Sequence, residues 1–482
     1  MSEMSERKKR DVVNLQNYYL NGKLQPCSLA EDIVFESSGE NKGIYVLKDN
    51  DDIIVWTGKQ YTIDKRGKLI KGMAQQLLGN IARINSRNEV VECVRNTKEI
   101  WIDRSELNKD VNLINLRNGT YNIATGEFTA HDKKNIITNY LDIEYNPKAD
   151  CPKIKKFMSE IHYPEDILGI QEWFGYNLYR EYPFHKFIIG LGEGENGKSV
   201  ELNLLSKFLG KENTVALSML KIAEVPHQIC ELDGKLANIY PDIKDKDINY
   251  MDIIKSLTCG DAITDDRKFG HPYTFISYAK LSFSCNILPR IREDTRAVWR
   301  RCQPINYPNK FEGKNADKNL LKKLTTDDEL SGLFNWSIEG LKRLLENEEF
   351  SFKIKDVEDI REYYKTKTEP IYVFTQKFLY YDANSKLTMG EVYERYENFV
   401  DVEKLEKTSQ SKFGRELKNY FPMLDKKTIK IEGRSYKFYI GLAWQNNSSV
   451  NVPQSVPIDK QQQLFSDVEI TQEEYERGAR HD

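Results

Sequence analysis

One short motif constrains the fold more than any other feature of this sequence. Residues 192–199 read GEGENGKS and fit the pattern G-x-x-x-x-G-K-[ST], directly after the apolar run at 187–191 and before a helical pattern at 199–209. A strand, such a loop and a helix form a phosphate-binding unit, in which glycines let backbone N–H groups curl around a phosphate. The sequence therefore predicts an α/β domain with a nucleotide site at this loop.

The residues of the loop have distinct expected roles. Lys198 is expected to neutralise the β- and γ-phosphates, and the Ser199 hydroxyl is expected to bind Mg²⁺. A glycine-rich turn without a ligand would need neither side chain, so a plain turn is the poorer interpretation. The predicted nucleotide-binding residues are Gly192, Glu193, Gly194, Glu195, Asn196, Gly197, Lys198, Ser199 and Val200.

A nucleotide hydrolase also needs an acid at the end of a neighbouring strand. The strand pattern at 236–240 leads to Asp242, which we expect to bind Mg²⁺ through water and to orient the attacking water. A lone acid at a strand end is also common in any sheet, and Asp245 and Asp247 are less favoured substitutes. The phosphate-binding loop upstream favours the catalytic interpretation of Asp242.

Two further polar motifs follow. The strand predicted at 280–285 leads into Asn286, whose amide can hydrogen-bond a γ-phosphate, although an Asn close before Pro289 is equally typical of a turn. Arg300 and Arg301 come next, and arginine stabilises charge on a transferring phosphoryl group, often from a neighbouring subunit. A pair of solvated arginines is the alternative.

In this order and spacing, the motifs resemble the superfamily-3 helicase domain of the AAA+ class, and more narrowly the phage and plasmid primase-helicase C-terminal family. Residues 118–126 (NGTYNIATG) and the triplet at 150–152 are similar to the N-terminal module first named in poxvirus primase-helicases. The resemblance covers about residues 40–312. Its segments in the helicase domain are 192–199, 238–242, 280–286 and 298–301.

The resemblance implies an AAA+ P-loop core that hydrolyses ATP as a hexamer and translocates on single-stranded DNA. By resemblance, Asn286 senses the γ-phosphate, and Arg300 or Arg301 is the finger that reaches the neighbouring subunit's ATP. The Asp242 motif lacks the doubled acid of many relatives. Because no paired-Asp metal motif precedes the module, we expect no priming activity.

The resembled family also projects a hairpin with basic residues into the channel of the hexamer. Here the candidate is the segment 265–272, with Arg267, Lys268 and His271 as the expected contacts to DNA phosphates. An ordinary charged turn is the alternative, because two aspartates begin the segment and partly cancel its charge.

The C-terminal region carries a clearer charge signal. Between residues 407 and 439 there are nine Lys or Arg and three acids, in a chain of formal net charge −3. Helices followed by two strands around Gly433 are typical of a winged helix, which inserts its third helix into a major groove. The expected DNA contacts are Ser409, Gln410, Ser411, Lys412, Arg415 and Lys418, with Arg434 on the wing. A basic domain that packs on another protein is the alternative.

Five regions follow from these patterns. They are an N-terminal α+β module at 1–150, with a hairpin at 44–56, a helicase domain at 151–350, a charged linker at 351–370, a winged-helix domain at 371–444 and a disordered tail at 445–482. Strands that alternate with helices in the second region predict a largely parallel sheet that is covered on both faces.

Composition excludes several other classes of protein. A chain of 482 residues with 39% hydrophobic residues can build sizeable cores, and it is no disordered chain or disulfide mini-protein. No apolar run approaches the ~20 residues of a membrane helix, and the charged start does not fit a secretion signal. Seven scattered cysteines without a Cys-x-x-Cys pair support neither a zinc ribbon nor a disulfide framework, so we expect a cytoplasmic location.

The sequence therefore predicts an ATP-dependent, ring-forming DNA helicase that acts in the replication of a mobile genetic element and uses Mg²⁺. The expected partners are single-stranded DNA in the channel, duplex origin DNA, further copies in a homo-hexamer and host replication proteins. A P-loop kinase or metabolic NTPase is less favoured, because the sequence contains no pattern that indicates a pocket for a small substrate. An ATP-gated transcriptional regulator that binds duplex DNA without unwinding it is the second alternative.

Overall fold

The computed structural model describes residues 18–445 except 22, 226, 244–247, 267–271, 312–316, 404, 406 and 432. The chain forms two compact units, Met1–Tyr364 and Lys365–Asp482. The segment 351–370, expected as a linker, contains helix α12 (Val357–Thr368). Ile360 and Tyr364 of this helix are fully buried in the core of the first unit. The expected tail lies outside the described residues from 446 onward.

The first unit begins with an α+β module. Its hairpin of β3 and β4 pairs Ile44 with Val55, which confirms the hairpin predicted for this segment. A second hairpin pairs β7 with β8 around Asn118 and Gly119. The module's elements are β1 (Tyr19–Leu20), β2 (Lys23–Leu24), α1 (Pro26–Val34), β3 (Ile44–Leu47), β4 (Ile53–Trp56), β5 (Tyr61–Ile63), α2 (Lys68–Leu78), α3 (Ile84–Arg95), β6 (Trp101–Ile102), β7 (Leu113–Leu116), β8 (Gly119–Asn122) and β9 (Phe128–Thr129).

A disulfide joins Cys27 of α1 to Cys93 of α3, with Cα atoms 5.1 Å apart. The cysteine pattern gave no support for a disulfide framework, and it did not predict this pair. The two helices share a core in which Leu29 and Val90 are fully buried, so their packing brings together cysteines that are 66 residues apart in sequence. Cys151, Cys230, Cys259, Cys285 and Cys302 are not disulfide-bonded.

A five-stranded parallel sheet forms the centre of the first unit, in the order β11-β12-β15-β10-β16. The parallel sheet confirms the α/β prediction for this region. Its strands and the surrounding elements are α4 (Pro152–Ile161), α5 (Ile167–Tyr176), β10 (Phe187–Leu191), α6 (Lys198–Leu209), β11 (Thr214–Val215), α7 (Met219–Glu224), β12 (Ala237–Tyr240), α8 (Asp252–Cys259), β13 (Ala262–Asp265), β14 (Tyr273–Ile276), β15 (Lys280–Cys285), α9 (Arg296–Trp299), β16 (Cys302–Asn306), α10 (Leu320–Leu324) and α11 (Asp327–Asn347).

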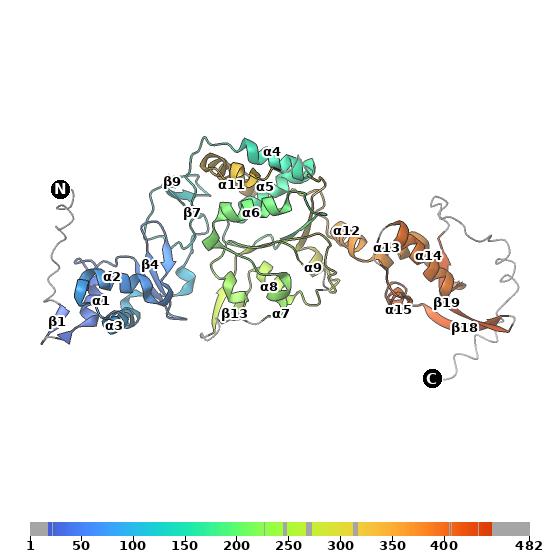
Figure 1. Ribbon diagram of the computed structural model, residues 1–482, viewed down its shortest axis with the longest axis horizontal. Coiled ribbons are helices and arrows are strands. Elements are labelled where there is room, and N and C mark those ends of the chain that lie inside the picture. Colours follow the sequence, from blue (N-terminus) through green and yellow to red (C-terminus); the bar gives the residue numbers. More distant parts are fainter. Residues whose placement is uncertain are drawn as a thin grey trace. The chain divides into compact units, whose positions relative to one another are not determined.

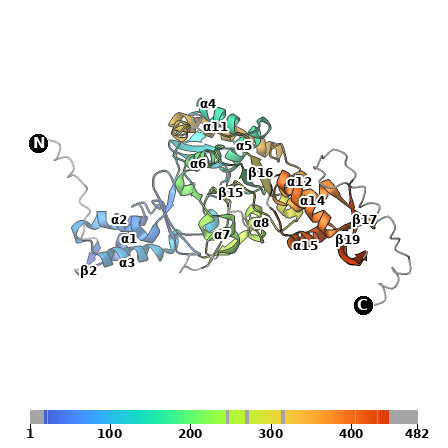
Figure 2. The same cartoon turned by 45° about the vertical axis from the view of Figure 1, so that its right-hand side comes forward.

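Helices cover both faces of this sheet, as its apolar strands require. Successive side chains of β10 enter opposite cores: Ile188 packs with α4, α5, α6 and α11, whereas Phe187 and Ile189 pack with α7, α8, α9 and α12. Figure 1 and Figure 2 show the first set of helices on one side of the sheet and α7 and α8 on the other. The sheet thereby fixes the ends of β10, β12 and β15 relative to one another.

Arg104 connects the N-terminal module to the sheet domain. Its guanidinium forms salt bridges with Asp49 of its own module and with Asp233 of the sheet domain, each at 2.6 Å. The same group lies 4.3 Å from the ring centroid of Tyr273, the first residue of β14. Because its side chain is only 14% exposed, these contacts are screened far less than surface ion pairs.

The second unit contains helix α13 (Pro370–Phe378), strand β17 (Leu379–Thr388), helices α14 (Met389–Val402) and α15 (Gln410–Tyr420), and strands β18 (Asp425–Ile431) and β19 (Arg434–Trp444). The sheet order is β17-β19-β18, and both pairings are antiparallel. The two C-terminal strands confirm the predicted ribbon around Gly433, whereas β17 was not predicted. The core around Phe374, Tyr396 and Phe413 holds the three helices against the sheet.

Within the described residues, no helix combines the length and the apolar composition that a bilayer span requires.

We predict that Arg104→Ala destabilises the protein by about 2 kcal/mol, because it removes two partly buried salt bridges and a cation–π contact together. Chemical denaturation of the full chain measures the loss. Arg95→Ala is the matched control, since the salt bridge of Arg95 with Glu92 is a more exposed i,i+3 pair that should contribute less than ~0.5 kcal/mol. Equal losses for the two variants would contradict the linking role of Arg104.

Candidate nucleotide site and nucleic-acid surfaces

The glycine-rich loop connects β10 to α6 in a conformation that depends on its glycines. Gly194 and Gly197 have φ values of 105° and 89°, a backbone region that side chains rarely adopt. A Cβ atom at Gly197 would also lie 2.6 Å from the side chain of Ile161, so α6 can begin there only without one. The loop places the first turn of α6 close to the carboxyl end of β10, as the sequence predicted.

Lys198 is 6% exposed and lies at the centre of the site. Its ammonium donates hydrogen bonds to the carbonyl oxygen of Gly192 and, at 3.0 Å, to Oδ1 of Asn286. Burial lowers the pKa of Lys198, while the nearby Cys285 and Asp242 side chains oppose the shift. The loop lysine and the predicted sensor amide are thus in direct contact.

The parallel sheet explains why these residues meet. β15 lies between β10 and β12, and Asn286 and Asp242 follow the carboxyl ends of β15 and β12. The Ile243 amide donates to the Ser284 carbonyl at 2.8 Å, which ties the segment after β12 to β15. Asp242 and Ser199 are both exposed, so their oxygen atoms are accessible to a cation. Asp245 and Asp247 lie outside the described residues.

A buried polar network below the loop was missing from the sequence prediction. Glu201 of α6 accepts a hydrogen bond from the Tyr307 hydroxyl at 2.6 Å, and its Oε2 lies 2.8 Å from Nε2 of His162. The His162 and Tyr307 rings are 4.8 Å apart. The three residues come from distant parts of the chain, so no local motif could have identified them. Their network fixes the first turn of α6 against the segments after α4 and β16.

The two adjacent arginines differ in environment. Arg301 is 4% exposed, and its guanidinium donates to Oγ1 of Thr258 at 3.1 Å and to the Ala297 carbonyl at 2.6 Å. Arg300 is exposed at the end of α9. Only Arg300 of this pair can therefore reach another molecule without a change in the fold.

A pocket of about 460 Å³ adjoins the glycine-rich loop, and its rim includes Glu195 and Gly197. The Phe311 amide donates to the Glu195 carbonyl at 2.7 Å, which fixes that side of the pocket to the loop. The apolar part of the lining is Phe157, Val200, Phe311, Leu320 and Leu324.

The predicted DNA hairpin corresponds to β13 and β14, which pair Ile263 with Phe275. The candidate contacts Arg267, Lys268 and His271 lie outside the described residues.

In the second unit, the candidate DNA contacts share one helix face. Phe413 and Leu417 of α15 are fully buried. The exposed residues of this helix and its N-terminal turn include Ser409, Gln410, Ser411, Lys412, Arg415 and Lys418, and Arg434 is exposed at the start of β19. The helix therefore has a buried apolar face, and the residues expected to contact DNA are exposed.

Two family models match the chain. Residues 33–162 match the family described as "D5 N terminal like", in agreement with the expected N-terminal module. Residues 191–301, from the glycine-rich loop to Arg301, match a family of unknown function, DUF5906.

Among curated proteins, the chain is 25% identical over 414 residues to a protein of Invertebrate iridescent virus 6 named "Putative helicase 184R". The match covers 73% of this chain and 41% of that protein, so the chain spans less than half of its relative. Two solved structures of the NrS-1 C-terminal region also match, with TM-scores of 0.46 and 0.44 and sequence identities of 10% and 11%. They cover 83% of this chain and 95% and 96% of their own chains. Together with the D5-like match, the similarity to a viral helicase supports the resemblance to phage-type primase-helicases.

Proposed function

We propose that this chain is an ATP-dependent, ring-forming DNA helicase that acts in replication of a mobile genetic element. The observation that carries the proposal is the contact between Lys198 of the loop and Asn286 at the end of the adjacent strand, beside Asp242. A turn without a ligand would not need a buried lysine and a polar amide at the carboxyl edge of a parallel sheet, where α/β proteins bind nucleotides. The similarity to a viral helicase supports the same class of function.

The strand order also supports an AAA+ assignment, because β15 lies between the loop strand and the acid strand. In the proposed site, the loop amides and Lys198 bind the phosphates of ATP. Asn286 exchanges its contact with Lys198 for the γ-phosphate or the attacking water, and Asp242 orients that water. The oxygen donors of Ser199 and Asp242 fit Mg²⁺, which would neutralise charge on the phosphates when bound.

The pocket beside the loop suits the base of the nucleotide. A base attached to phosphates on residues 192–199 can enter it directly, because Gly197 belongs to both the loop and the pocket. Its apolar lining, which includes the rings of Phe157 and Phe311, would contact the faces of a purine.

Arg300 is the proposed finger that contacts the ATP of a neighbouring subunit. It is exposed, whereas Arg301 bonds within its own chain. A finger supplied in trans requires subunit interfaces, which the proposed homo-hexamer provides.

The proposed DNA contacts have two parts. The hairpin of β13 and β14 would contact the backbone of single-stranded DNA in the ring channel. The second unit has the element order of a winged helix, with α15 as the recognition helix and the β18–β19 ribbon as the wing. This unit would bind duplex origin DNA, and host replication proteins are further candidate partners.

A transcriptional regulator without unwinding activity is the alternative function, and a strand-displacement assay with ATP distinguishes a helicase from such a regulator.

We predict that Lys198→Ala lowers ATP turnover by ~10²–10³-fold while the protein stays folded, because the charge of Lys198 is needed to bind the phosphates.

Calorimetry with ATP and with inorganic tripolyphosphate separates phosphate binding from base binding. Lys198→Ala should weaken the binding of both ligands, whereas Phe311→Ala should weaken ATP binding and leave tripolyphosphate binding unchanged. Normal turnover in folded Lys198→Ala would refute the nucleotide site, and equal effects of Phe311→Ala on both ligands would refute the base pocket.

Arg300→Ala should spare ATP binding and reduce hydrolysis by ~10³-fold or more, the typical contribution of an arginine finger. Mixing Arg300→Ala with Lys198→Ala subunits should restore some ATPase activity, because one kind of mixed interface keeps an intact loop and an intact finger. If the mixtures stay inactive at every ratio while rings form, Arg300 does not act in trans. Arg301→Ala is the comparison variant and should lower stability, since its guanidinium bonds within the chain.

Arg415→Ala should reduce binding to a preferred duplex site by about 1–3 kcal/mol and bind random DNA almost normally, as expected for a lost base contact. Lys407→Ala is the matched control, because Lys407 already forms an ion pair with Asp401 at 2.9 Å.

A chain that lacks residues 371–482 should keep its ATPase activity and fork unwinding but lose site preference in competition binding assays. Undiminished site preference in that truncated chain would place recognition in the first unit.

A further inference from the structure

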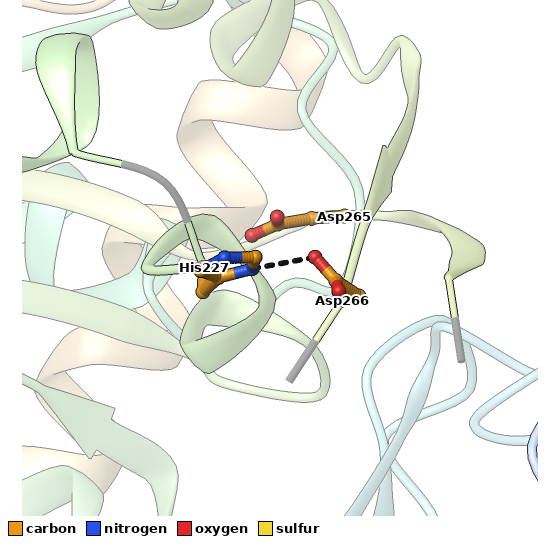
Figure 3. Close-up of side chains that lie close together, drawn as sticks. All are labelled: His227, Asp265 and Asp266. Carbon is orange, nitrogen blue, oxygen red and sulfur yellow. Dashed lines mark hydrogen bonds and ion pairs between the residues drawn. The ribbon is translucent and has the colours of Figure 1, made fainter. Parts of the chain in front are cut away.

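We propose that His227, Asp265 and Asp266 form a binding site for a divalent transition-metal ion, with Zn²⁺ as the best fit. Figure 3 shows the imidazole and the two carboxylates directed toward one another. One potential ligand atom from each residue lies within 4.8 Å of the other two. His227 follows α7, and both aspartates lie at the end of β13, so the cluster joins two separate segments of the chain.

The spacing of the ligand atoms suits a small cation. Ligands that bind zinc at about 2.0–2.2 Å in tetrahedral geometry lie roughly 3.3–3.6 Å from one another. Nδ1 of His227 and Oδ1 of Asp266 are 2.6 Å apart, and the remaining separations do not exceed 4.8 Å. Small rotations of these side chains therefore bring three ligands to a common centre. The His227 and Asp266 side chains are 46% and 28% exposed, which leaves access for the ion and for water as a further ligand.

The charge of the cluster also favours a divalent cation. Two carboxylates and a neutral imidazole carry a charge of −2, which one such ion would balance. In the described part of the chain, neither aspartate forms an ion pair with Lys or Arg: Asp265 accepts from the Cys230 amide at 2.8 Å, and Asp266 pairs with His227. An imidazole nitrogen together with carboxylate oxygens suits Zn²⁺ and its first-row neighbours, whereas Mg²⁺ prefers oxygen ligands alone.

A bound ion would fix the base of the β13–β14 hairpin to the segment after α7. The contacts between these segments include the Cys230 amide donating to Asp265, the Cys230 thiol donating to the Asp266 carbonyl oxygen at 3.4 Å, and the His227–Asp266 pair. The ion would take the place of the hydrogen bond between His227 and Asp266, with the imidazole proton on Nε2, and would add Asp265 to the same centre. Any effect on DNA binding rests on the proposed function of the hairpin, but metal binding itself does not.

Titration of the nucleotide-free full chain tests the site, after removal of metals with a chelator. Calorimetry with Zn²⁺ should show one site per chain, and His227→Ala, Asp265→Asn and Asp266→Asn should each lower its affinity at least ~10-fold. The Asn variants preserve shape and can still accept hydrogen bonds, so they separate metal binding from folding. Asp261→Asn is the matched control, because Asp261 is an exposed acid beside β13 that lies outside the cluster.

Co²⁺ absorption identifies the ligands. A tetrahedral spectrum without a thiolate charge-transfer band is expected, together with a Zn²⁺-dependent rise in the melting temperature of the native chain that is absent in the Asp266→Asn variant. A thiolate band would place the metal on a free cysteine and overturn the proposal. No stoichiometric binding, or binding that survives all three substitutions, would show that the cluster is only an ion pair.

Discussion

The ammonium of Lys198, bonded to the Gly192 carbonyl and the Asn286 amide, is the interaction on which the arrangement of the candidate site depends. Burial disfavours the charged form of this lysine, so the surrounding oxygen atoms must compensate for lost hydration. They can do so only because β10 and β15 are adjacent and parallel, which places the loop and Asn286 at one edge of the sheet. The order of the strands is thus a requirement of the site as much as a property of the fold.

A second buried polar side chain, Glu201, supports the same loop from below. A carboxylate that is removed from water is costly unless donors satisfy it, and Glu201 has the Tyr307 hydroxyl and the His162 ring as partners. Both contacts converge on the first turn of α6, immediately after Lys198 and Ser199. The position of the loop is therefore fixed by polar contacts with the segments that follow α4 and β16, in addition to the apolar cores on both sides of the sheet.

Local features were predictable from the sequence, and features that depend on distant contacts were not. The loop, the β3–β4 hairpin and the faces of α15 have local patterns, and the structure contains all three. β17 was missed because its segment includes turn-forming polar residues, and its pairing with β19 spans a register shift between Tyr381 and Lys386. The Cys27–Cys93 disulfide and the burial of Arg301 depend on tertiary packing, which the spacing of residues along the sequence does not reveal.

The hairpin of β13 and β14 is fixed at its base by contacts from outside its own strands. Arg104 of the N-terminal module covers Tyr273, the Cys230 amide binds Asp265, and His227 pairs with Asp266. A displacement of the hairpin relative to the sheet would break these contacts or carry their partners along. Because Arg104 also bonds Asp233, which lies shortly before the amino end of β12, the N-terminal module contacts both the hairpin and the sheet domain at the start of this strand. The module therefore helps to fix the base of the hairpin against the sheet domain.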